Sequence, residues 1–252
     1  MSTKIAVAGK GGSGKTSVAS GLIAEFIARE ETPVLAVDAD PNWTLCFALA
    51  CEPADTVAEI REERQPPAGM SRPEYLELRM QEALVEHEGF DLLVMGRPEG
   101  AGCYCAVNNL LRKELGRLGR GYRAVVMDNE AGLEHLSRRT TEDVDVLLVV
   151  AQPNRVGLAS ARRVVETSAA QELAIGRTIL VLNGVRGDPS EAILHEVEEI
   201  PHDSLCLVPW SEELWQAAEA GDPVSRIPRG AAWWRAISQV ADAVLEPEPA
   251  RV

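Results

Sequence analysis

A glycine-rich loop near the start of the chain constrains the fold more than any other stretch. The loop Gly9-Lys10-Gly11-Gly12-Ser13-Gly14-Lys15-Thr16 follows an apolar run over residues 5–8 and precedes a stretch of helical periodicity over 18–28. Its spacing fits G-x-x-x-x-G-K-[ST], in which glycines turn consecutive backbone N–H groups around phosphate oxygens. The sequence therefore predicts a strand, a phosphate-binding loop and a helix, with a nucleoside triphosphate as the ligand.

Each polar residue of this loop has an expected role. We expect Lys15 to reach the β- and γ-phosphates, the Thr16 hydroxyl to ligate Mg²⁺, and Ser17 to meet the α-phosphate. The helix that begins here adds a partial positive charge that favours the bound anion. The backbone contacts to phosphate are expected from Gly11, Gly12, Ser13 and Gly14.

The same letters allow a second interpretation. Gly9-x-Gly11-x-x-Gly14 also satisfies the dinucleotide-binding fingerprint, and Asp38 ends the next predicted strand near where a ribose-binding acid is found. A nicotinamide-dependent reductase is therefore an alternative. The pair Lys15-Thr16 favours a triphosphate, because a pyrophosphate bridge needs neither a lysine nor a metal-binding hydroxyl.

The loop also resembles that of a known family. Residues 10–16 are similar to the deviant KGGxGK[ST] loop of the dimeric ATPases that include MinD, ParA, the nitrogenase iron protein and the CooC-type maturation factors of carbon monoxide dehydrogenase. This resemblance implies ATP with Mg²⁺ as the ligand and a homodimer that encloses the nucleotides. It implies that Lys10 reaches across the dimer to the partner's phosphates, much as an arginine finger does.

Acidic residues follow the predicted strands over 33–37 and 124–127. A carboxylate in the position of Asp128 is expected to hold Mg²⁺ through a water molecule. The resemblance implies that residues 38–42 form the first switch segment, in which Asp38 supports the Mg²⁺ shell and Asp40 orients or deprotonates the attacking water. It also implies that residues 128–132 form the second switch segment, in which Gly132 responds to the γ-phosphate. The nitrogenase iron protein has a cluster-binding cysteine in this segment and this chain has none, which argues against a [4Fe–4S] electron donor.

Two further positions concern the adenine. The resemblance implies that Asn183, after the predicted strand 178–182, hydrogen-bonds the base, and that Pro209 lies in the loop that walls it. In the family a basic residue often follows this asparagine, whereas Gly184 follows here. A plain Asn-Gly turn is therefore an alternative, and the base specificity stays open.

A pair of cysteines follows the third predicted strand. Cys103 and Cys105 come after a segment with three glycines and a proline, residues 96–102. Thiols at i and i+2 make a strained disulfide but a good half of a thiolate metal site, although two incidental thiols are the alternative. The loop from Gly96 to Cys105 resembles the C-x-C loop of the CooC-type proteins, which implies nickel delivery to carbon monoxide dehydrogenase. Because thiolate sites usually close at four ligands, we expect two chains to share one Ni²⁺ or Zn²⁺.

The net charge limits the classes of molecule that the chain is expected to bind. The chain has 25 Lys and Arg against 39 Asp and Glu, a formal charge of −14, which repels nucleic acid and anionic lipid. This argues against the ParA-like alternative of a partitioning protein carried on DNA, and favours proteins or cations as partners. The five cysteines, an odd number, predict reduced thiols, with Cys46, Cys51 and Cys206 as small core residues.

Hydrophobic patterning predicts where the chain resides and how it folds. No apolar run of 18 residues and no signal peptide is apparent, so we expect a cytoplasmic protein. The C-terminal apolar stripe at 233, 237, 240 and 244 is expected to dock on a sheet rather than on a membrane. We expect one doubly wound α/β domain over 1–252, with a mostly parallel sheet of about seven strands flanked by helices. Residues 52–88 are predicted to form a mobile connection and then one solvated helix that includes Val85.

Overall fold

The computed structural model describes residues 2–52, 55–63, 66–97, 110, 115–130, 143–171 and 173–246. Its strands form one sheet of eight strands in the order β3-β4-β2-β5-β1-β6-β7-β8. Every pair is parallel except β3 and β4, which are antiparallel. The expected α/β fold is confirmed, with one strand more than the seven predicted. The strands are β1 Thr3–Gly9, β2 Val34–Ala39, β3 Val85–His87, β4 Phe90–Val94, β5 Ala124–Asn129, β6 Asp143–Ala151, β7 Ala174–Val185 and β8 Ser204–Pro209.

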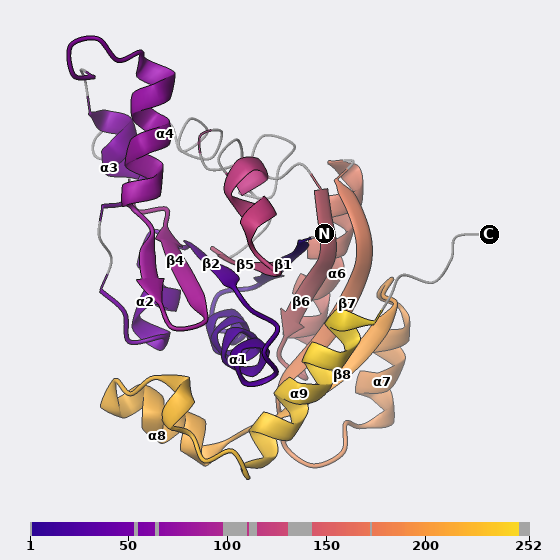
Figure 1. Cartoon of the computed structure of the whole chain (residues 1–252). Coiled ribbons are helices and arrows are strands. Elements are labelled where there is room, and N and C mark those ends of the chain that lie inside the picture. Colours follow the sequence, from indigo (N-terminus) through magenta and orange to yellow (C-terminus); the bar gives the residue numbers. More distant parts are fainter. Residues whose placement is uncertain are drawn as a thin grey trace.

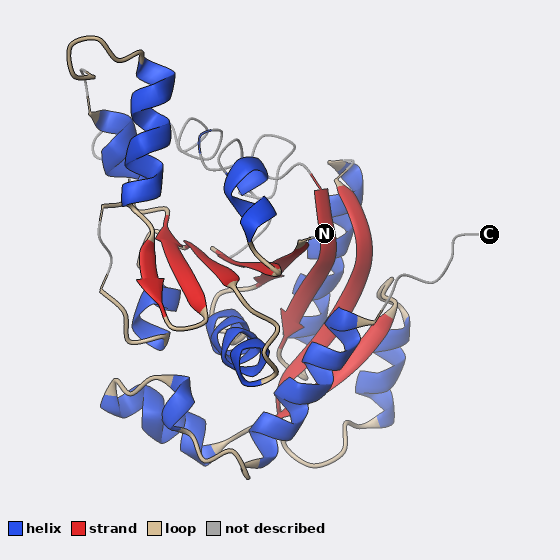
Figure 2. Ribbon diagram, in the orientation of Figure 1, coloured by secondary structure: helices blue, strands red, loops and turns tan. Residues whose placement is uncertain are grey.

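Helices cover both faces of this sheet (Figures 1 and 2). Residues of α1, α2 and α9 pack in one apolar cluster with one face of the strands, and residues of α3, α4, α6 and α7 pack in a second cluster with the other face. The described helices are α1 Lys15–Ala28, α2 Thr44–Ala48, α3 Val57–Glu62, α4 Arg72–Glu82, α6 Arg155–Ala170, α7 Glu191–Glu198, α8 Glu212–Ala220 and α9 Ala232–Leu245, with 3₁₀ turns at Gly119–Gly121 and Val224–Arg226.

The central strands explain why the sequence favours this architecture. In β1, Ile5 and Val7 belong to one apolar cluster, and Ala6 and Ala8 belong to the other. Side chains alternate between the faces of a strand, so a strand that is covered on both sides needs an unbroken apolar run. This run is what the sequence shows before the glycine loop.

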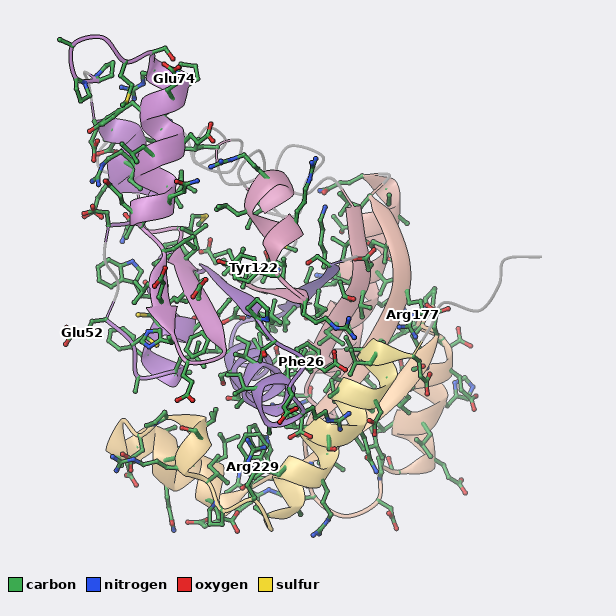
Figure 3. The ribbon with its side chains drawn as sticks, viewed as in Figure 1. Phe26, Glu52, Glu74, Tyr122, Arg177 and Arg229 are labelled. Carbon is green, nitrogen blue, oxygen red and sulfur yellow. The ribbon has the colours of Figure 1, made fainter. Side chains whose placement is uncertain are left out.

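The segment between α2 and β4 differs from the prediction of one helix extending through Val85. Two helices form instead, because Thr56 and Ser71 each begin one with a capping box completed by Glu59 and Glu74. Val85 lies in β3, opposite Leu92 of β4. In Figure 3 the two helices stand away from the sheet, with Glu74 near their outer end.

Helices α3 and α4 together form what we call the helical arm, and the side chain of Arg79 connects its parts. The Arg79 guanidinium contacts the carboxylates of Asp55, Glu63 and Glu82 at 2.6, 2.9 and 2.7 Å. Tyr75 donates a further hydrogen bond to Glu63. A network of this kind fixes the arm better than isolated surface pairs would.

The C-terminal helix docks on the sheet as expected. Its stripe of Trp233, Ile237, Val240 and Val244 is buried in the same cluster as α1. The contact is close enough that a Cβ at Gly21 of α1 would lie 2.7 Å from the Trp233 ring. The three cysteines predicted as core residues, Cys46, Cys51 and Cys206, are buried.

The remaining boundaries shift modestly. Strand β7 is longer than the predicted 178–182, and Leu110 and residues 115–118 are helical. Within the described part of the chain, no helix is both long and apolar enough to cross a bilayer.

Candidate functional site

The carboxyl ends of β1, β2 and β5 meet at one edge of the sheet. Asp38 of β2 is in register with Asp128 of β5, and Asp128 is also in register with Val7, just before the glycine loop. Ligands of open α/β sheets bind at this edge, where the chain leaves the strands. The parallel register therefore brings two predicted acids beside the predicted phosphate loop.

Glycine is required at both ends of the loop. A Cβ on Gly9 would lie 2.3 Å from the Val150 carbonyl oxygen, and a Cβ on Gly14 would lie 2.0 Å from Asn183 Nδ2. Gly14 also has φ of 91°, which side chains disfavour. At these two positions the loop has no room for a side chain, which fits close approach of backbone to phosphate.

The two loop lysines differ in environment. Lys15 is 8% exposed, and its Nζ lies 3.4 Å from the Lys10 carbonyl oxygen. Lys10 itself is exposed. Lys15 is held over the loop, whereas the Lys10 side chain is available to another molecule.

Thr16 and Asp128 form the predicted Mg²⁺ pair. The Thr16 hydroxyl donates a 2.6 Å hydrogen bond to Asp128 Oδ2 and lies 3.2 Å from the Thr44 hydroxyl. The other carboxylate oxygen of Asp128 is buried and has no hydrogen-bond partner among the described residues. Hydroxyl and carboxylate oxygens are the ligands that Mg²⁺ prefers, so an orphaned carboxylate oxygen beside a phosphate loop fits that ion.

Electrostatics at this edge also favour a cation. Burial raises the pKa of Asp128 to about 7, helped by the negative charges of Asp38 and Asp40 and opposed by the Thr16 hydrogen bond and the charge of Lys15. Burial likewise raises the pKa of Asp38 to about 6 against the backbone hydrogen bonds that it accepts. The negative charges of Asp38 and Asp40 thus act on Asp128, and a divalent cation at this edge would reduce that repulsion.

Asp38 links this site to the first switch segment. Its Oδ2 accepts the backbone N–H of Cys46 at 2.9 Å, within α2, and its Oδ1 accepts the N–H of Asp40 at 3.2 Å. Asp40 in turn accepts hydrogen bonds from the backbone and side-chain nitrogens of Asn42, both at 2.8 Å. A change at the Asp38 carboxylate is therefore transmitted to the backbone of both Asp40 and α2.

Sequence reasoning missed three polar residues of this site. Thr44 meets the Thr16 hydroxyl, and Gln152 Nε2 donates to the Gly12 carbonyl oxygen at 3.2 Å. Asn129 Nδ2 donates to the Val7 carbonyl oxygen at 3.0 Å. Gln152 follows β6 directly, and its place after a strand was the one signal that marked it.

Asn183 contacts the loop itself. Its Nδ2 donates to the Ser13 carbonyl oxygen at 2.9 Å, while the Ser13 hydroxyl is buried without a partner. Gly184 has φ of 80° and lies at a register shift in β7, so the Asn-Gly pair forms a bulge in a continuing strand rather than the turn considered as an alternative.

A basic residue does follow this asparagine, later than the resemblance led us to expect. This residue is Arg186, whose guanidinium lies 4.3 Å from the centre of the Trp210 ring. Trp210 directly follows Pro209, the last residue of β8. The adenine contacts of Asn183 and Pro209 remain predictions.

The predicted metal ligands Cys103 and Cys105, and the switch glycine Gly132, lie outside the described residues. Among the residues that are described, no group of three or more His, Cys, Asp or Glu side chains is arranged to hold a metal. A P-loop Mg²⁺ is consistent with this finding, because its ligands come largely from the nucleotide and from water.

The family of the chain follows from comparison with known proteins. The CobQ/CobB/MinD/ParA nucleotide binding domain family matches residues 4–224. The chain belongs to this family. The family match, together with its ATP-binding relatives, makes the chain a P-loop ATPase of the MinD/ParA type.

Two relatives bear on its role. An uncharacterized ATP-binding protein of Methanocaldococcus jannaschii is 38% identical over 248 residues, which cover 96% of this chain and 98% of that protein. The carbon monoxide dehydrogenase accessory protein CooC of Rhodospirillum rubrum is 31% identical over 236 residues, 86% of this chain and 88% of that protein.

Solved structures support the fold. The MinD cell division protein of Aquifex aeolicus superimposes with a TM-score of 0.73 at 19% identity and covers 100% of both chains. The septum site-determining protein MinD of Pyrococcus horikoshii, solved in complex with Mg-ADP, gives a TM-score of 0.71 at 18% identity, with 98% of this chain and 97% of that chain covered.

Proposed function

We propose that this MinD/ParA-type ATPase is a maturation factor whose homodimer binds Ni²⁺ or Zn²⁺ at its interface and assists nickel insertion into carbon monoxide dehydrogenase. The observation that carries the proposal is the similarity to a carbon monoxide dehydrogenase accessory protein over most of both chains. The C-x-C pair Cys103 and Cys105 supports it, because paired thiolates suit soft metal ions.

The nucleotide half of the mechanism uses the edge of the sheet described above. Lys15 pairs with the β- and γ-phosphates, Ser17 meets the α-phosphate, and Thr16 with Asp128 orients the Mg²⁺ and its water shell. Bound Mg²⁺ supplies positive charge that offsets the charge developing on the transferred phosphoryl group. Asp40 orients the attacking water, and the exposed Lys10 reaches the partner's phosphates, so hydrolysis requires two chains.

The switch uses Asp38. Its carboxylate accepts hydrogen bonds from the amide nitrogens of Cys46 and Asp40, so a Mg²⁺ held by Thr16 and Asp128 would change the electrostatic field at a group already bonded to the first switch segment. Gly132 reports the γ-phosphate from the second segment. Nucleotide binding and the position of both segments are thereby linked, which is the requirement for a two-state ATPase.

The metal half needs two copies of the chain. One chain offers two thiolates from the C-x-C loop, and a two-fold axis doubles that number to the four that close a tetrahedral or square-planar site. Nickel is the cargo in this scheme and ATP-driven closure gates its release. A protein client also fits the net charge of −14, because a chain of this charge is repelled by DNA.

Metal titration combined with size-exclusion chromatography, with and without ATP, tests the proposal. The wild type should bind one Ni²⁺ or Zn²⁺ per two chains, and Cys103→Ala/Cys105→Ala should lose it. Cys206→Ala is the matched control, because that thiol is buried in the core away from the nucleotide edge. Undiminished metal binding by the double variant would overturn the proposal. A salt-dependent mobility shift with duplex DNA would instead favour the partitioning alternative, and nicotinamide dinucleotide binding without Mg²⁺ would favour a reductase.

A further inference from the structure

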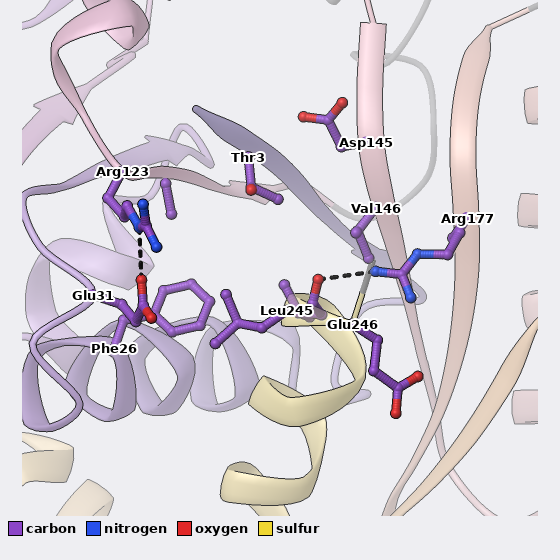
Figure 4. Close-up of a pocket in the computed structure, with 11 residues that line it drawn as sticks. Thr3, Phe26, Glu31, Arg123, Asp145, Val146, Arg177, Leu245 and Glu246 are labelled. Atoms are coloured by element: carbon purple, nitrogen blue, oxygen red, sulfur yellow. Dashed lines mark hydrogen bonds and ion pairs between the residues drawn. The ribbon is translucent and has the colours of Figure 1, made fainter. Parts of the chain in front are cut away.

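A cavity of about 570 Å³ lies at the amino ends of the strands, at the edge opposite the phosphate loop (Figure 4). Its walls come from the first residues of β1 and β5, from β6 and β7, and from the end of α9. The volume is within the usual range of small-molecule sites, which is about 300–1,000 Å³. None of the residues assigned to the nucleotide lines it.

Arg177 of β7 is the unusual member of the lining. The residue is 8% exposed, yet among the described residues the one hydrogen bond of its side chain joins Nη2 to the Val244 carbonyl oxygen at 2.9 Å. Its Nε is buried without a hydrogen-bond partner, and no carboxylate pairs with it among the described residues. A guanidinium carries five N–H donors and a permanent charge, and a buried charge without a counter-ion is unfavourable. Arg177 therefore lines the cavity with a guanidinium charge that no carboxylate of the described residues neutralises.

The other walls limit what can satisfy Arg177. Phe26, Val146 and Leu245 give the cavity apolar surface, and Figure 4 shows Arg123 on the opposite side, paired with Glu31 at 2.7 Å. Asp145 and Glu246 also line the cavity, and Asp145 accepts the backbone N–H of Lys4 at 2.7 Å. Nearby carboxylates repel a multiply charged anion more strongly than a singly charged one.

We propose that this cavity binds a small organic monocarboxylate, whose carboxylate pairs with Arg177 and whose apolar body lies against Phe26 and Leu245. A planar carboxylate matches the fork of a guanidinium, which can donate end-on from its two Nη groups. The cavity lies at the far ends of the strands that carry the nucleotide residues. The proposal is therefore independent of the metal and of the client enzyme.

Calorimetric titration of the full chain with benzoate at neutral pH tests the site. Benzoate should bind at one per chain, benzamide, the uncharged probe of the same shape, should bind at least about tenfold more weakly, and so should inorganic phosphate. Arg177→Gln should weaken benzoate binding at least about tenfold and leave benzamide unchanged. Arg235→Gln is the control, because Arg235 is exposed on α9 and contacts only the Gly230 carbonyl oxygen among the described residues. Glu246→Gln should tighten benzoate binding, and more so at low salt.

If Arg177→Gln does not fold, methyl NMR of the wild type can locate the bound benzoate instead. Benzoate added to the wild type should shift the methyl resonances of Val146 and Val244, which lie in the cavity wall, and leave those of Val208, in the core by β8, in place. Absence of benzoate binding, equal binding of benzamide, tighter binding of phosphate, or shifts confined to the nucleotide edge would each overturn the proposal.

Discussion

Asp128 is a buried carboxyl group, and its protonation is expected to depend on whether Mg²⁺ and nucleotide are bound. Burial raises the pKa of this group to about 7 from its ordinary value of 3.8, so the folded state binds the proton more tightly than the unfolded state. The stability that the protonated form contributes is fully present below about pH 4 and is lost as the pH rises to about 7.

Asp128→Asn should therefore stabilise the nucleotide-free protein at pH 7.5, by on the order of 2 kcal/mol, and much less at pH 5. Urea unfolding at the two pH values measures the difference, with Asp188→Asn as an exposed control. The same variant should lose Mg²⁺-dependent nucleotide binding, because the amide is a poorer magnesium ligand. A variant that is destabilised equally at both pH values would show that Asp128 is ionised and satisfied in the free protein.

The two loop lysines should separate binding from turnover. Lys15→Ala should abolish ATP binding, because the side chain lies over the phosphate cradle. Lys10→Ala should retain binding and lose most hydrolysis, by a factor of about 10³ if the residue resembles an arginine finger. Lys4→Ala is the control, since Lys4 lies at the other end of β1. Binding by calorimetry and phosphate release measure the two properties, and unchanged turnover in both loop variants would refute the assignment.

At the scale of elements, one glycine fixes the arm to the end of β4. Gly96 has φ of 72°, and a Cβ there would lie 2.4 Å from Thr56 Cβ and Oγ1 at the start of α3. Gly187 has a similar φ of 71°, but a Cβ there would have no atom within 4 Å. Gly187 is therefore a control that has the backbone conformation of Gly96 without its close contact.

Gly187→Ala should lower the free energy of unfolding by about 1–2 kcal/mol, from left-handed backbone strain alone. Gly96→Ala should lower it by about 1–3 kcal/mol more, because α3 must shift as well. Chemical denaturation of both variants measures the difference. Equal losses would mean that the arm is free to move away from β4.

Much of the element pattern could be predicted from sequence because the relevant signals are local. The apolar strands, the glycine loop and the stripe of α9 follow from periodicity over a few turns or residues. The arm could not be predicted correctly, although both capping boxes stand in the sequence, because Leu84 and Val85 extend the helical spacing beyond Glu82. Pairing with β4, a contact made only in the fold, decides that Val85 joins a strand.

The site was predictable to the same extent. A sequence motif and the positions directly after predicted strands were enough to predict Lys15, Thr16, Asp38 and Asp128. Thr44 and Gln152 do not, because their contacts to residues 28 and 140 positions away depend on how the strands are ordered in the sheet. The contact of Arg186 with Trp210 likewise depends on how β7 and β8 pair, and this pairing includes a register shift between Asn183 and Val185.

At the scale of the whole molecule, the account rests on two chains that close around nucleotide. The exposed Lys10 and the unsatisfied oxygen of Asp128 lie at the same edge of the sheet, so a partner that approaches this edge meets the bound phosphates directly. Each chain carries a charge of −14, so contact between two copies must overcome repulsion that salt reduces.

The central claim is that Mg·ATP bound at the loop brings two chains together. Light scattering at constant protein concentration and 150 mM salt tests it most directly, with Asp40→Ala included to slow hydrolysis during the measurement. With Mg·ATP, the wild type and Asp40→Ala should show twice the mass of one chain, whereas Lys15→Ala should show the mass of a single chain. With Mg·ADP, the wild type should stay at the lower mass. The same mass in saturating Mg·ATP and Mg·ADP would contradict the account.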